Sequence, residues 1–586
     1  MEMRRRAFIG SAAALAAAPG WPADEKPLFK VGFMTDTHVG TTKKSCALVK
    51  AAFSVFKAQG CEAIVHCGDL ADWHYEEGYK YYLEELEEAY PPDMANRPQF
   101  LYVLANHDVL DPKRKDPKLR ATRGMDHDTA FKDMCKRLKI DHWYFEQRDL
   151  HGYPILVFPQ SMSHVGGYAE VEKKIAKACA DYPGKPVFVC THQPSADTCY
   201  NSGSWGDYNL RKVMDKFPQV VQFNGHTHGS LRNEMSVWQG EFTAVDVCCL
   251  QVWHGISVGT PLKSKPAYGV VVMEVFPSRL ALRRYDVRDG SEIFPDRPWV
   301  VPLPYDRATA PLTVERRAKT ARPGRFPAGA KLECVPDATP FTCVKLAFPA
   351  VENEEDVETY RIEVARRDGG EWEKFACCDI FSGFYLRPQD RKPAHERTIS
   401  SAFLDNAGAE YRFTVTPMGF FGTPGASLET VWKATEKKAV KVLWSCDNPM
   451  EELEFLYGWP QNDEQMRSSK KVPLRDGWYV PPTKAWLMPK PGIWNIEKGA
   501  NIRFIAEMSL DQPEFLETWN LYLQVNDGTS RSIPGGWTST PGGKVGTFRY
   551  VVEAKMPTPG LDYGICFTRG HGGKVRFKSI RIERVD

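Results

Sequence analysis

Short, mostly apolar runs alternate with segments of helical spacing over the first half of the chain. The runs Phe29–Thr35 and Ala63–Cys67 are typical of strands buried on both faces of a sheet. Between and after them, Ser45–Gln59 and Glu76–Tyr90 carry apolar residues three and four positions apart, which predicts helices. Further apolar runs of the first kind are Phe100–Leu104, Ile155–Pro159, Val187–Thr191 and Val220–Asn224.

The next strands follow one another with little helix between them, at Phe242–Leu250, Tyr268–Phe276 and Leu280–Tyr285. Taken together, residues 28–289 alternate strands with helices, and this order predicts a layered α/β domain. In such domains the loops after the carboxyl ends of the strands carry the functional residues.

The pattern changes after residue 289. Residues 290–330 are rich in Pro, Arg and Ala and are predicted to form a linker. Between residues 331 and 435, three segments alternate apolar and polar residues and are separated by turn residues: Thr342–Phe348, Glu358–Arg366 and Glu410–Pro417. This part is therefore predicted to be an all-β domain.

Residues 436–586 predict a second all-β domain, a β-sandwich or jelly roll. Strand-like runs lie at Asn501–Met508, Leu521–Val525, Thr547–Glu553 and Val575–Glu583. The region holds seven of the 16 tryptophans of the chain: Trp444, Trp459, Trp478, Trp486, Trp494, Trp519 and Trp537. These rings either fill the core of the sandwich or stack on a glycan or another cell-surface ligand, and the sequence leaves both roles open.

The composition narrows the class of protein. The 586 residues are 42% hydrophobic and 26% charged, a globular balance that excludes bulk disorder. The net charge of the whole chain is +2, and residues 1–23 carry +2 of it, which leaves 2 − 2 = 0 for the rest. A neutral chain has no overall attraction to nucleic acid, so none is expected as a partner. No apolar stretch reaches the ~18–20 residues of a transmembrane segment.

Residues 1–23 have the order of an export signal. The pair Arg5-Arg6 is followed by Phe8-Ile9, then by an alanine-rich apolar segment over Ser11–Ala18 and by small residues that suit cleavage. An alanine-rich helical N-terminus is the alternative. The twin-arginine reading predicts a periplasmic or extracellular protein that crosses the membrane already folded.

Polar clusters stand directly after five of the predicted strands. In an extended segment, residues i and i+2 point to the same side, so Asp36 with His38, and His226 with His228, can face one ion. Carboxylate, imidazole and amide side chains bind borderline divalent or trivalent metals. One such strand end is more often structural, but five in one domain predict a metal site. The five clusters are Asp36-Thr37-His38, Gly68-Asp69, Asn106-His107-Asp108, Thr191-His192 and Gly225-His226-Thr227-His228.

This ordered set of clusters resembles the calcineurin-like metallophosphoesterase family. The resemblance covers residues 28–289 and includes the spacing from Asp36 to Asp69 (33 residues) and from Asp69 to Asn106 (37 residues). It implies an αββα sandwich with a dinuclear metal centre at the strand ends. The whole chain is then a multidomain protein, an αββα metallophosphoesterase sandwich followed by two all-β sandwich domains.

The resemblance also implies roles for individual residues. The first metal ion would be held by Asp36, His38, Asp69 and His228. The second would be held by Asp69, Asn106, His192 and His226. His107 would contact the phosphate or protonate the leaving group, and Asp108 would orient His107. The ions would be divalent or trivalent iron, manganese or zinc.

Two departures from family patterns bear on the branch. Ala105 stands where the family usually has glycine, and its methyl group is expected to be tolerated because Asn-His-Asp follows intact. Asp72 occupies the place of a tyrosine ligand in purple acid phosphatases, and those enzymes lack the histidine that is His38 here. The chain therefore resembles the cyclic-nucleotide phosphodiesterase-like branch.

Separately, residues 331–435 resemble a fibronectin type III module, with Tyr360 and Tyr411 at its core tyrosine positions, although Phe348 replaces a common tryptophan.

The leading hypothesis is an exported enzyme that hydrolyses phosphate mono- or diesters of small molecules by in-line attack of a hydroxide bridging two metal ions. The alternatives are a surface- or glycan-binding protein with an inactive phosphoesterase domain, and a nuclease. Between the last two histidine clusters, Ser195–Tyr208 carries polar and aromatic residues that are candidates for a substrate pocket: Asp197, Tyr200, Asn201, Trp205 and Asp207.

Overall fold

The computed structural model describes residues 25–109, 127–140, 145–250, 268–336, 344–367, 369–399, 409–433 and 439–446, and beyond residue 446 the strands named below with residues 497, 499 and 500. The predicted export signal at 1–23 and the side chains of the C-terminal tryptophans lie outside this description. The chain divides into two compact units, with the boundary between Arg322 and Pro323. Within the described part, no helix has the length and apolar character needed to cross a membrane.

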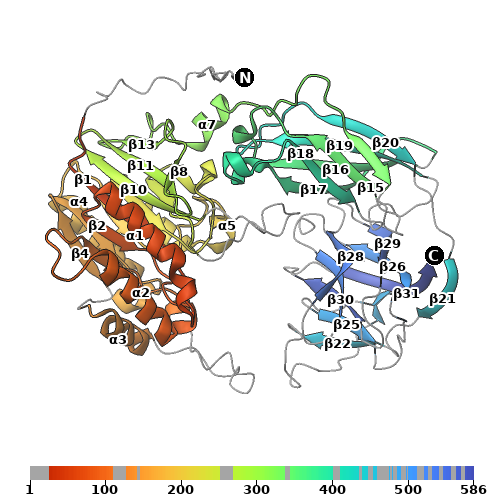
Figure 1. Cartoon of the computed structure of the whole chain (residues 1–586), viewed down its shortest axis with the longest axis horizontal. Coiled ribbons are helices and arrows are strands. Elements are labelled where there is room, and N and C mark those ends of the chain that lie inside the picture. Colours follow the sequence, from red (N-terminus) through yellow and green to blue (C-terminus); the bar gives the residue numbers. More distant parts are fainter. Residues whose placement is uncertain are drawn as a thin grey trace, which may run out of the picture. The chain divides into compact units, whose positions relative to one another are not determined.

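One sheet of the first unit has the strand order β12-β11-β10-β1-β2-β3, and β13 pairs with β11 (Figure 1). Strands β1, β2 and β3 are parallel, whereas β10 is antiparallel to β1. Helices α1, α2 and α3 contribute Phe53, Tyr82 and Met134 to the core on one face of this sheet. The bounds are β1 Phe29–Met34, α1 Ala47–Gln59, β2 Ala63–His66, α2 Glu76–Ala89, β3 Gln99–Tyr102, α3 His127–Leu138, β10 Gly269–Phe276, β11 Arg279–Asp286, β12 Ser291–Ile293 and β13 Trp299–Pro302.

The second sheet has the order β4-β5-β6-β7-β9-β8, with β5, β6, β7 and β9 parallel. Every residue of β5, β6 and β7 is buried, because the sheet is covered on both faces. Helices α4 and α6 pack on it through residues such as Ile175 and Leu210. The bounds are β4 Glu146–Leu150, β5 Tyr153–Val157, α4 Tyr168–Asp181, β6 Val187–Cys190, α5 Ser202–Trp205, α6 Tyr208–Met214, β7 Val220–Asn224, β8 Val237–Gln239 and β9 Thr243–Asp246.

The two sheets pack face to face through aromatic side chains. The ring of Phe33 in β1 stacks on the ring of Phe223 in β7, with centroids 3.7 Å apart. Phe188 of β6 meets Phe223 edge-on at 6.4 Å. With helices on both outer faces, these layers confirm the predicted αββα sandwich. The edge strands β4 and β8 were not predicted, since β4 is mostly polar and exposed and therefore lacks an apolar run.

The expectation of a linker at 290–330 is wrong for its first part. Strands β12 and β13 both pair with β11, and Trp299 in β13 is 1% exposed. The Trp299 indole donates a hydrogen bond of 2.9 Å to Glu234, and the Arg284 guanidinium lies 4.1 Å from the centre of its ring. Helix α7 (Val314–Thr320) follows within the same unit. The strand pattern was missed because β12 and β13 have only three and four residues and lie within a Pro- and Arg-rich stretch.

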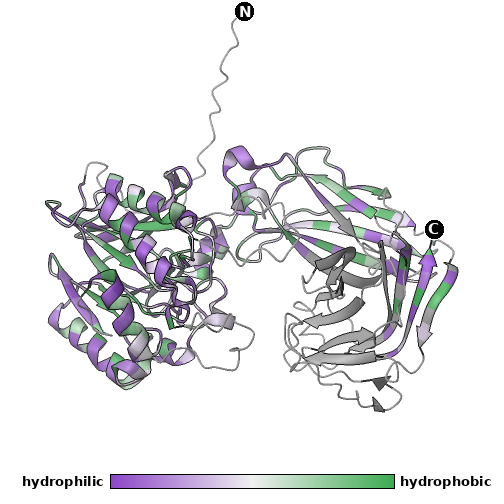
Figure 2. Ribbon diagram, turned by 60° about the horizontal axis from the view of Figure 1, so that its bottom comes forward, coloured by the Kyte–Doolittle hydropathy of each residue, from purple (hydrophilic) through white to green (hydrophobic). Residues whose placement is uncertain are grey.

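The second unit begins with two antiparallel sheets around a shared apolar core that includes Phe348, Tyr360 and Tyr411. Alternate residues of β16 and β19 are buried, as a half-exposed sheet requires. Figure 2 shows hydrophobic and hydrophilic residues alternating along strands of the protein. The sheets have the orders β14-β15-β18 and β17-β16-β19-β20. The bounds are β14 Glu333–Pro336, β15 Val344–Pro349, β16 Thr359–Arg367, β17 Glu373–Phe381, β18 Ala394–Ile399, β19 Glu410–Met418 and β20 Leu428–Lys433.

Two further antiparallel sheets complete this unit, in the orders β23-β24-β31-β26-β29, with β21 beside β31, and β22-β25-β30-β27-β28. They confirm that the C-terminal region is built of strands. The bounds are β21 Ala439–Cys446, β22 Leu453–Tyr457, β23 Leu474–Arg475, β24 Trp478–Tyr479, β25 Ala485–Pro489, β26 Asn501–Leu510, β27 Asn520–Val525, β28 Arg531–Ser539, β29 Gly546–Lys555, β30 Tyr563–Thr568 and β31 Val575–Val585.

Candidate metal centre

The predicted ligands lie in five loops that directly follow β1, β2, β3, β6 and β7. Five of them have a left-handed backbone: Asp36 (φ 51°), His38 (φ 40°), Asp69 (φ 53°), His226 (φ 70°) and His228 (φ 51°). Positive φ is uncommon outside glycine and costs about 1–3 kcal/mol per residue, although aspartate, asparagine and histidine tolerate it best. Such strain persists only where the surrounding structure enforces it, and here it coincides with the predicted metal site.

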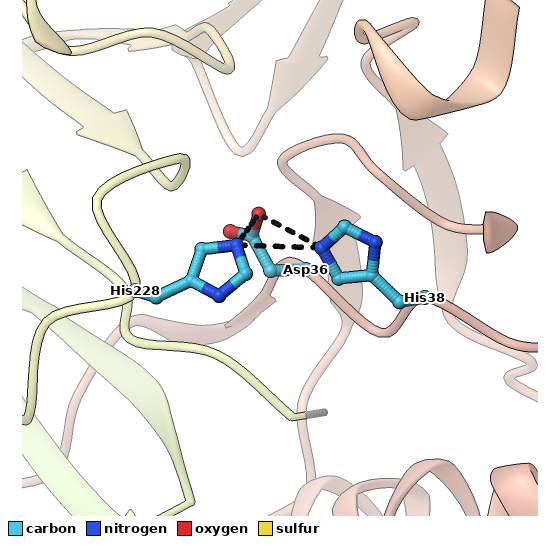
Figure 3. Close-up of side chains that lie close together, drawn as sticks. All are labelled: Asp36, His38 and His228. Atoms are coloured by element: carbon cyan, nitrogen blue, oxygen red, sulfur yellow. Dashed lines mark hydrogen bonds and ion pairs between the residues drawn. The ribbon is translucent and has the colours of Figure 1, made fainter. Parts of the chain in front are cut away.

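One group of ligands consists of Asp36, His38 and His228. The Nε2 atom of His228 lies 2.9 Å from Oδ1 of Asp36 and 3.3 Å from Nε2 of His38. Figure 3 shows both rings turning a nitrogen toward the Asp36 carboxylate from opposite sides. All three side chains are almost fully buried. Two imidazole nitrogens and a carboxylate oxygen that converge in this way suit a transition-metal ion.

A second group consists of Asp69, His192 and His226. Nε2 of His192 lies 3.2 Å from Oδ2 of Asp69 and 3.1 Å from Nδ1 of His226. The same Oδ2 atom lies 3.8 Å from Nε2 of His38, in the first group. One carboxylate oxygen of Asp69 therefore faces both groups, which is the position of a bridging ligand.

Hydrogen bonds fix the two carboxylates so that one oxygen of each stays directed at the cluster. Oδ2 of Asp36 accepts from the backbone N–H of His226 at 2.9 Å and from the Thr35 hydroxyl at 2.8 Å. Oδ1 of Asp69 accepts from the backbone N–H of His107 at 2.8 Å. The remaining oxygens, Oδ1 of Asp36 and Oδ2 of Asp69, are those that approach the histidine rings.

The surroundings of His192 and Asn106 show whether these side chains are suited to bind a metal ion. Nδ1 of His192 lies 2.9 Å from the carbonyl oxygen of Cys67, and a proton on Nδ1 would leave Nε2 as a metal-binding lone pair. The side-chain oxygen of Asn106 is buried and has no hydrogen-bond partner among the described residues. An unsatisfied buried polar atom costs about 1–3 kcal/mol, and a cation would satisfy this one. The donor set therefore fits the predicted metal centre.

Electrostatics favours the metal-binding forms of Asp36, Asp69 and His226. It does not favour that of His192, because burial alone would lower the pKa of His192 but Asp69 and Asp36 raise it to about 9. Burial alone would raise the pKa of Asp36, but the histidines His228 and His192 hold it well below its usual range. Burial is likewise outweighed at Asp69, where His192 lowers the pKa to about 2. For His226, burial and then the charge of His192 lower the pKa to about 4, so its ring is neutral at pH 7. Ionised carboxylates and a neutral imidazole are the states that bind metal.

His107 lies against the first group, but its orienting partner differs from the expected one. Its ring meets the ring of His38 edge-on at 4.4 Å, and its Nδ1 atom lies 3.0 Å from Oδ1 of Asp72. Burial would lower the pKa of His107, yet the hydrogen bond to Asp72 and the charge of Asp69 raise it above its usual value. Asp72 therefore takes the orienting role that we expected of Asp108. The sequence feature that could have pointed to Asp72 is its position three residues after Asp69.

Asp108 instead organises the backbone. Its carboxylate makes no hydrogen bond to His107 in the described structure and accepts four backbone N–H groups from two loops. Oδ2 accepts from Asp69 (3.1 Å) and Ala105 (3.2 Å), and Oδ1 accepts from Leu70 (3.0 Å) and Ala71 (3.1 Å). A side chain that is bound by four amides in this way fixes the turn that carries Asp69.

The unusual Ala105 fits because its neighbour is glycine. A Cβ atom on Gly68, whose φ is 102°, would lie 2.7 Å from the Ala105 methyl and 2.6 Å from Nδ1 of His192. The absence of a side chain at Gly68 thus leaves room for the methyl group and for the His192 ring. The methyl group of Ala105 therefore occupies space that a side chain at position 68 would need.

A cavity adjoins the cluster, and only part of its lining was predicted. Asp207 lines it, whereas Asp197, Tyr200 and Asn201 are absent from its described lining. Trp205 lies elsewhere at the site, with its ring 5.2 Å from that of His226. The lining residues that we missed include Gln160, Ser161, Ser163 and Tyr168. They follow the strand predicted at Ile155–Pro159, so the rule of polar residues at strand ends would have found the first three.

A two-sheet α/β sandwich whose strand ends gather aspartate and histidine into overlapping ligand groups defines the class of metallophosphoesterases. Residues 29–230 match the family model described as calcineurin-like phosphoesterase. This part of the chain is thus a calcineurin-like metallophosphoesterase domain, and its buried clusters are typical of the dinuclear site of that family.

Comparison with solved structures gives distant similarities. YfcE, a phosphoesterase from E. coli, is 13% identical with a TM-score of 0.24, covering 45% of this chain and 97% of its own. The sulfate thiohydrolase SoxB of Thermus thermophilus is 9% identical with a TM-score of 0.27, covering 46% and 59%. The C-terminal CBM6 of LamC from Zobellia galactanivorans is 15% identical with a TM-score of 0.15, covering 25% and 96%. None of the curated proteins matches the chain.

Proposed function

We propose that the protein is an exported phosphoesterase that hydrolyses phosphate mono- or diesters of small molecules. One observation carries the proposal: a single carboxylate oxygen of Asp69 faces both ligand groups, at 3.8 Å from His38 and 3.2 Å from His192. The presence of D-x-H in the first cluster favours the cyclic-nucleotide phosphodiesterase-like branch. Export is supported by the twin-arginine pattern of residues 1–23 alone.

Two groups of side chains would hold two metal ions. Asp36, His38 and His228 form the first with Asp69, and His192, His226 and Asn106 form the second with the same Asp69. When bound, the two ions would supply charge neutralisation of the phosphoryl oxygens and activation of a water nucleophile. The chain's own contribution is to hold these ligands in one arrangement, because each carboxylate is anchored by a separate hydrogen bond.

His107 is suited to the leaving-group side of the reaction. Its Nδ1 atom faces Asp72, so its Nε2 atom is the one available to donate a proton to a departing alkoxide. Asp72 keeps the ring in that orientation and stabilises its protonated form. In this scheme, no described side chain acts as the nucleophile.

The C-terminal region is proposed to bind a glycan or another cell-surface ligand. The support is its tryptophan content, seven of 16 in residues 436–586, on a frame of antiparallel strands. Retention of the full-length protein on a polysaccharide or cell-wall matrix tests this role separately from catalysis.

The central experiment combines metal analysis with ester hydrolysis. After reconstitution with iron, manganese or zinc, the protein should hold two ions per chain and hydrolyse 4-nitrophenyl phosphate or its bis-ester. Asp69→Asn should abolish hydrolysis, whereas the matched control Asp93→Asn, at an exposed aspartate outside the cluster, should not. A wild-type protein with two ions and no activity on any ester would support the alternative of an inactive binding protein.

A further inference from the structure

The cavity beside the ligand groups has the size of a small-molecule site. It measures about 470 Å³, within the ~300–1,000 Å³ range of ligand pockets. Asn106 forms part of its wall, so the cavity is continuous with the predicted metal centre. The other walls come from the loops after β5 and β6 and from the first turns of α4 and α6.

The described lining is mostly polar and uncharged, with two apolar residues, Val109 and Met162. It includes Gln160, Ser161, Ser163 and Gln193, and its one charged described residue is Asp207. The side-chain oxygen of Gln160 is buried without a hydrogen-bond partner among the described residues. Its backbone is fixed, because the N–H of Gln160 donates to the carbonyl of Leu104 at 2.9 Å. Gln160 therefore combines a fixed backbone with an unsatisfied side-chain oxygen, which suits it to accept a hydrogen bond from a hydroxyl group.

The carboxylate of Asp207 already accepts three hydrogen bonds within the protein. Its Oδ1 atom accepts from the backbone N–H groups of Asn209 (2.8 Å) and Leu210 (3.0 Å) and caps α6. Its Oδ2 atom accepts from the hydroxyl of Tyr168 at 2.5 Å. Since the Tyr168 proton is committed to Asp207, the Tyr168 oxygen is left as an acceptor in the cavity wall. A second anionic group of a substrate would therefore meet acceptors and a carboxylate.

We propose that this cavity binds the organic part of the phosphate ester, and that this part is an uncharged, hydroxyl-bearing group of the size of a sugar or polyol. The inference rests on the proposed function, because it places the phosphoryl group at the metal centre and the alcohol beyond Asn106. Gln160 is then a specificity-determining residue, whose oxygen accepts a hydrogen bond from a substrate hydroxyl. An ammonium-bearing alcohol is disfavoured because the charge of Asp207 is already stabilised by Tyr168 and by two amides.

The test compares four phosphate monoesters on the metal-loaded, full-length protein. They are a hexose phosphate, butyl phosphate without a donor, ethanolamine phosphate with an ammonium group, and a phosphoglycerate with a carboxylate. We expect kcat/KM to be about tenfold higher for the hexose ester than for butyl phosphate, the value of one or two satisfied hydrogen bonds. Gln160→Leu should remove that preference, so that the ratio of the kcat/KM values for the hexose and butyl esters falls to about one. The control Gln99→Leu, at the exposed start of β3, should retain it.

Equal rates on the hexose and butyl esters would overturn the proposal, as would the highest rate on the ammonium or carboxylate ester. Thermal midpoints and metal contents equal to wild type would show that Gln160→Leu is folded. Gln160→Glu provides a second variant, which should retain a hexose preference because its carboxylate keeps an acceptor oxygen for the substrate hydroxyl. If no ester is hydrolysed, including 4-nitrophenyl phosphate, the proposed function fails. A thermal shift with free sorbitol, present in wild type and lost in Gln160→Leu, would then support polyol binding in the cavity independently of catalysis. No shift in the wild-type protein would contradict it.

Discussion

Nδ1 of His107 lies 3.0 Å from Oδ1 of Asp72, and this contact joins the loop after β3 to the loop after β2. Asp72 should therefore act as a positioning residue. We expect Asp72→Ala to keep two metal ions and to lower kcat on an alkyl phosphate by about 10–100-fold, because His107 loses its orientation. Asp72→Asn should recover part of the rate. Loss of metal in Asp72→Ala would assign Asp72 to the metal centre instead.

His107 itself should matter for the leaving group rather than for metal binding. His107→Ala is expected to retain both ions and to lose about 10²–10⁴-fold in rate on an alkyl ester, the usual contribution of general acid catalysis. A 4-nitrophenyl ester needs little protonation and should be far less impaired. Similar losses on both esters would point to electrostatic stabilisation of the phosphoryl oxygens, and normal rates on both would remove His107 from the mechanism.

Substitutions of a shared ligand and of a ligand in one group should change the metal content differently. Asp69→Asn should weaken both metal sites, because its Oδ2 atom faces both groups. His38→Ala should empty mainly one site, since its Nε2 atom lies with Asp36 and His228. Elemental analysis after reconstitution checks both. At most one ion in the wild-type protein would contradict a dinuclear centre.

Gly68 should not tolerate a side chain. In Gly68→Ala the new methyl would lie 2.6 Å from Nδ1 of His192, at a backbone φ of 102°. We expect a destabilisation of about 1–3 kcal/mol from the strained backbone, and a reduced metal content because the His192 ring must move. Denaturant unfolding and metal analysis measure the two effects. Gly60→Ala is the matched control, because it has a positive φ but open space around it.

The second unit contains a buried carboxylate with a predictable pH response. Oε1 of Glu354 lies 2.6 Å from Nε2 of His395 and accepts from the hydroxyl of Tyr360 (3.1 Å) and the N–H of Gly383 (2.8 Å). Burial would raise the pKa of Glu354, but His395 and these donors lower it. The stabilisation is thus complete above the ordinary glutamate pKa of ~4.3 and is lost as the pH falls through the lower folded-state value.

Glu354→Gln should therefore lower the free energy of unfolding of this unit by about 3 kcal/mol at pH 7, and by much less near pH 3. Unfolding curves at several pH values measure the difference. Glu355→Gln, at a neighbouring and more exposed carboxylate, is the control. A difference that does not change with pH would show that the charge of Glu354 does not contribute.

The strand ends of the first domain were predictable because two simple rules agree there. Buried parallel strands leave short apolar runs in the sequence, and their carboxyl ends must meet at one edge of the sandwich. The clusters at Asp36, Asp69 and Asn106 could be located for that reason. The strands β12 and β13 could not, since they have only three and four residues and lie in a Pro- and Arg-rich stretch.

The orientation of side chains around the site could not be predicted from the sequence. Asp108 and Asp72 are both acidic residues close to His107 along the chain or in space, and no pattern tells which one reaches its ring. The choice depends on the backbone of the turn, where Trp73 has φ 54° and the N–H groups of Leu70 and Ala71 point at Asp108. Such conformations follow from tertiary packing rather than from local preference.

The four amide hydrogen bonds of Asp108 have a consequence for metal exchange. They secure the loops after β2 and β3 through protein contacts alone, including the N–H of Asp69 itself. A centre whose loops are fixed in this way does not depend on metal for its folding, in contrast to small zinc domains. Chelation should then empty the centre while the domain stays folded, and a different metal should be able to enter without a refolding step.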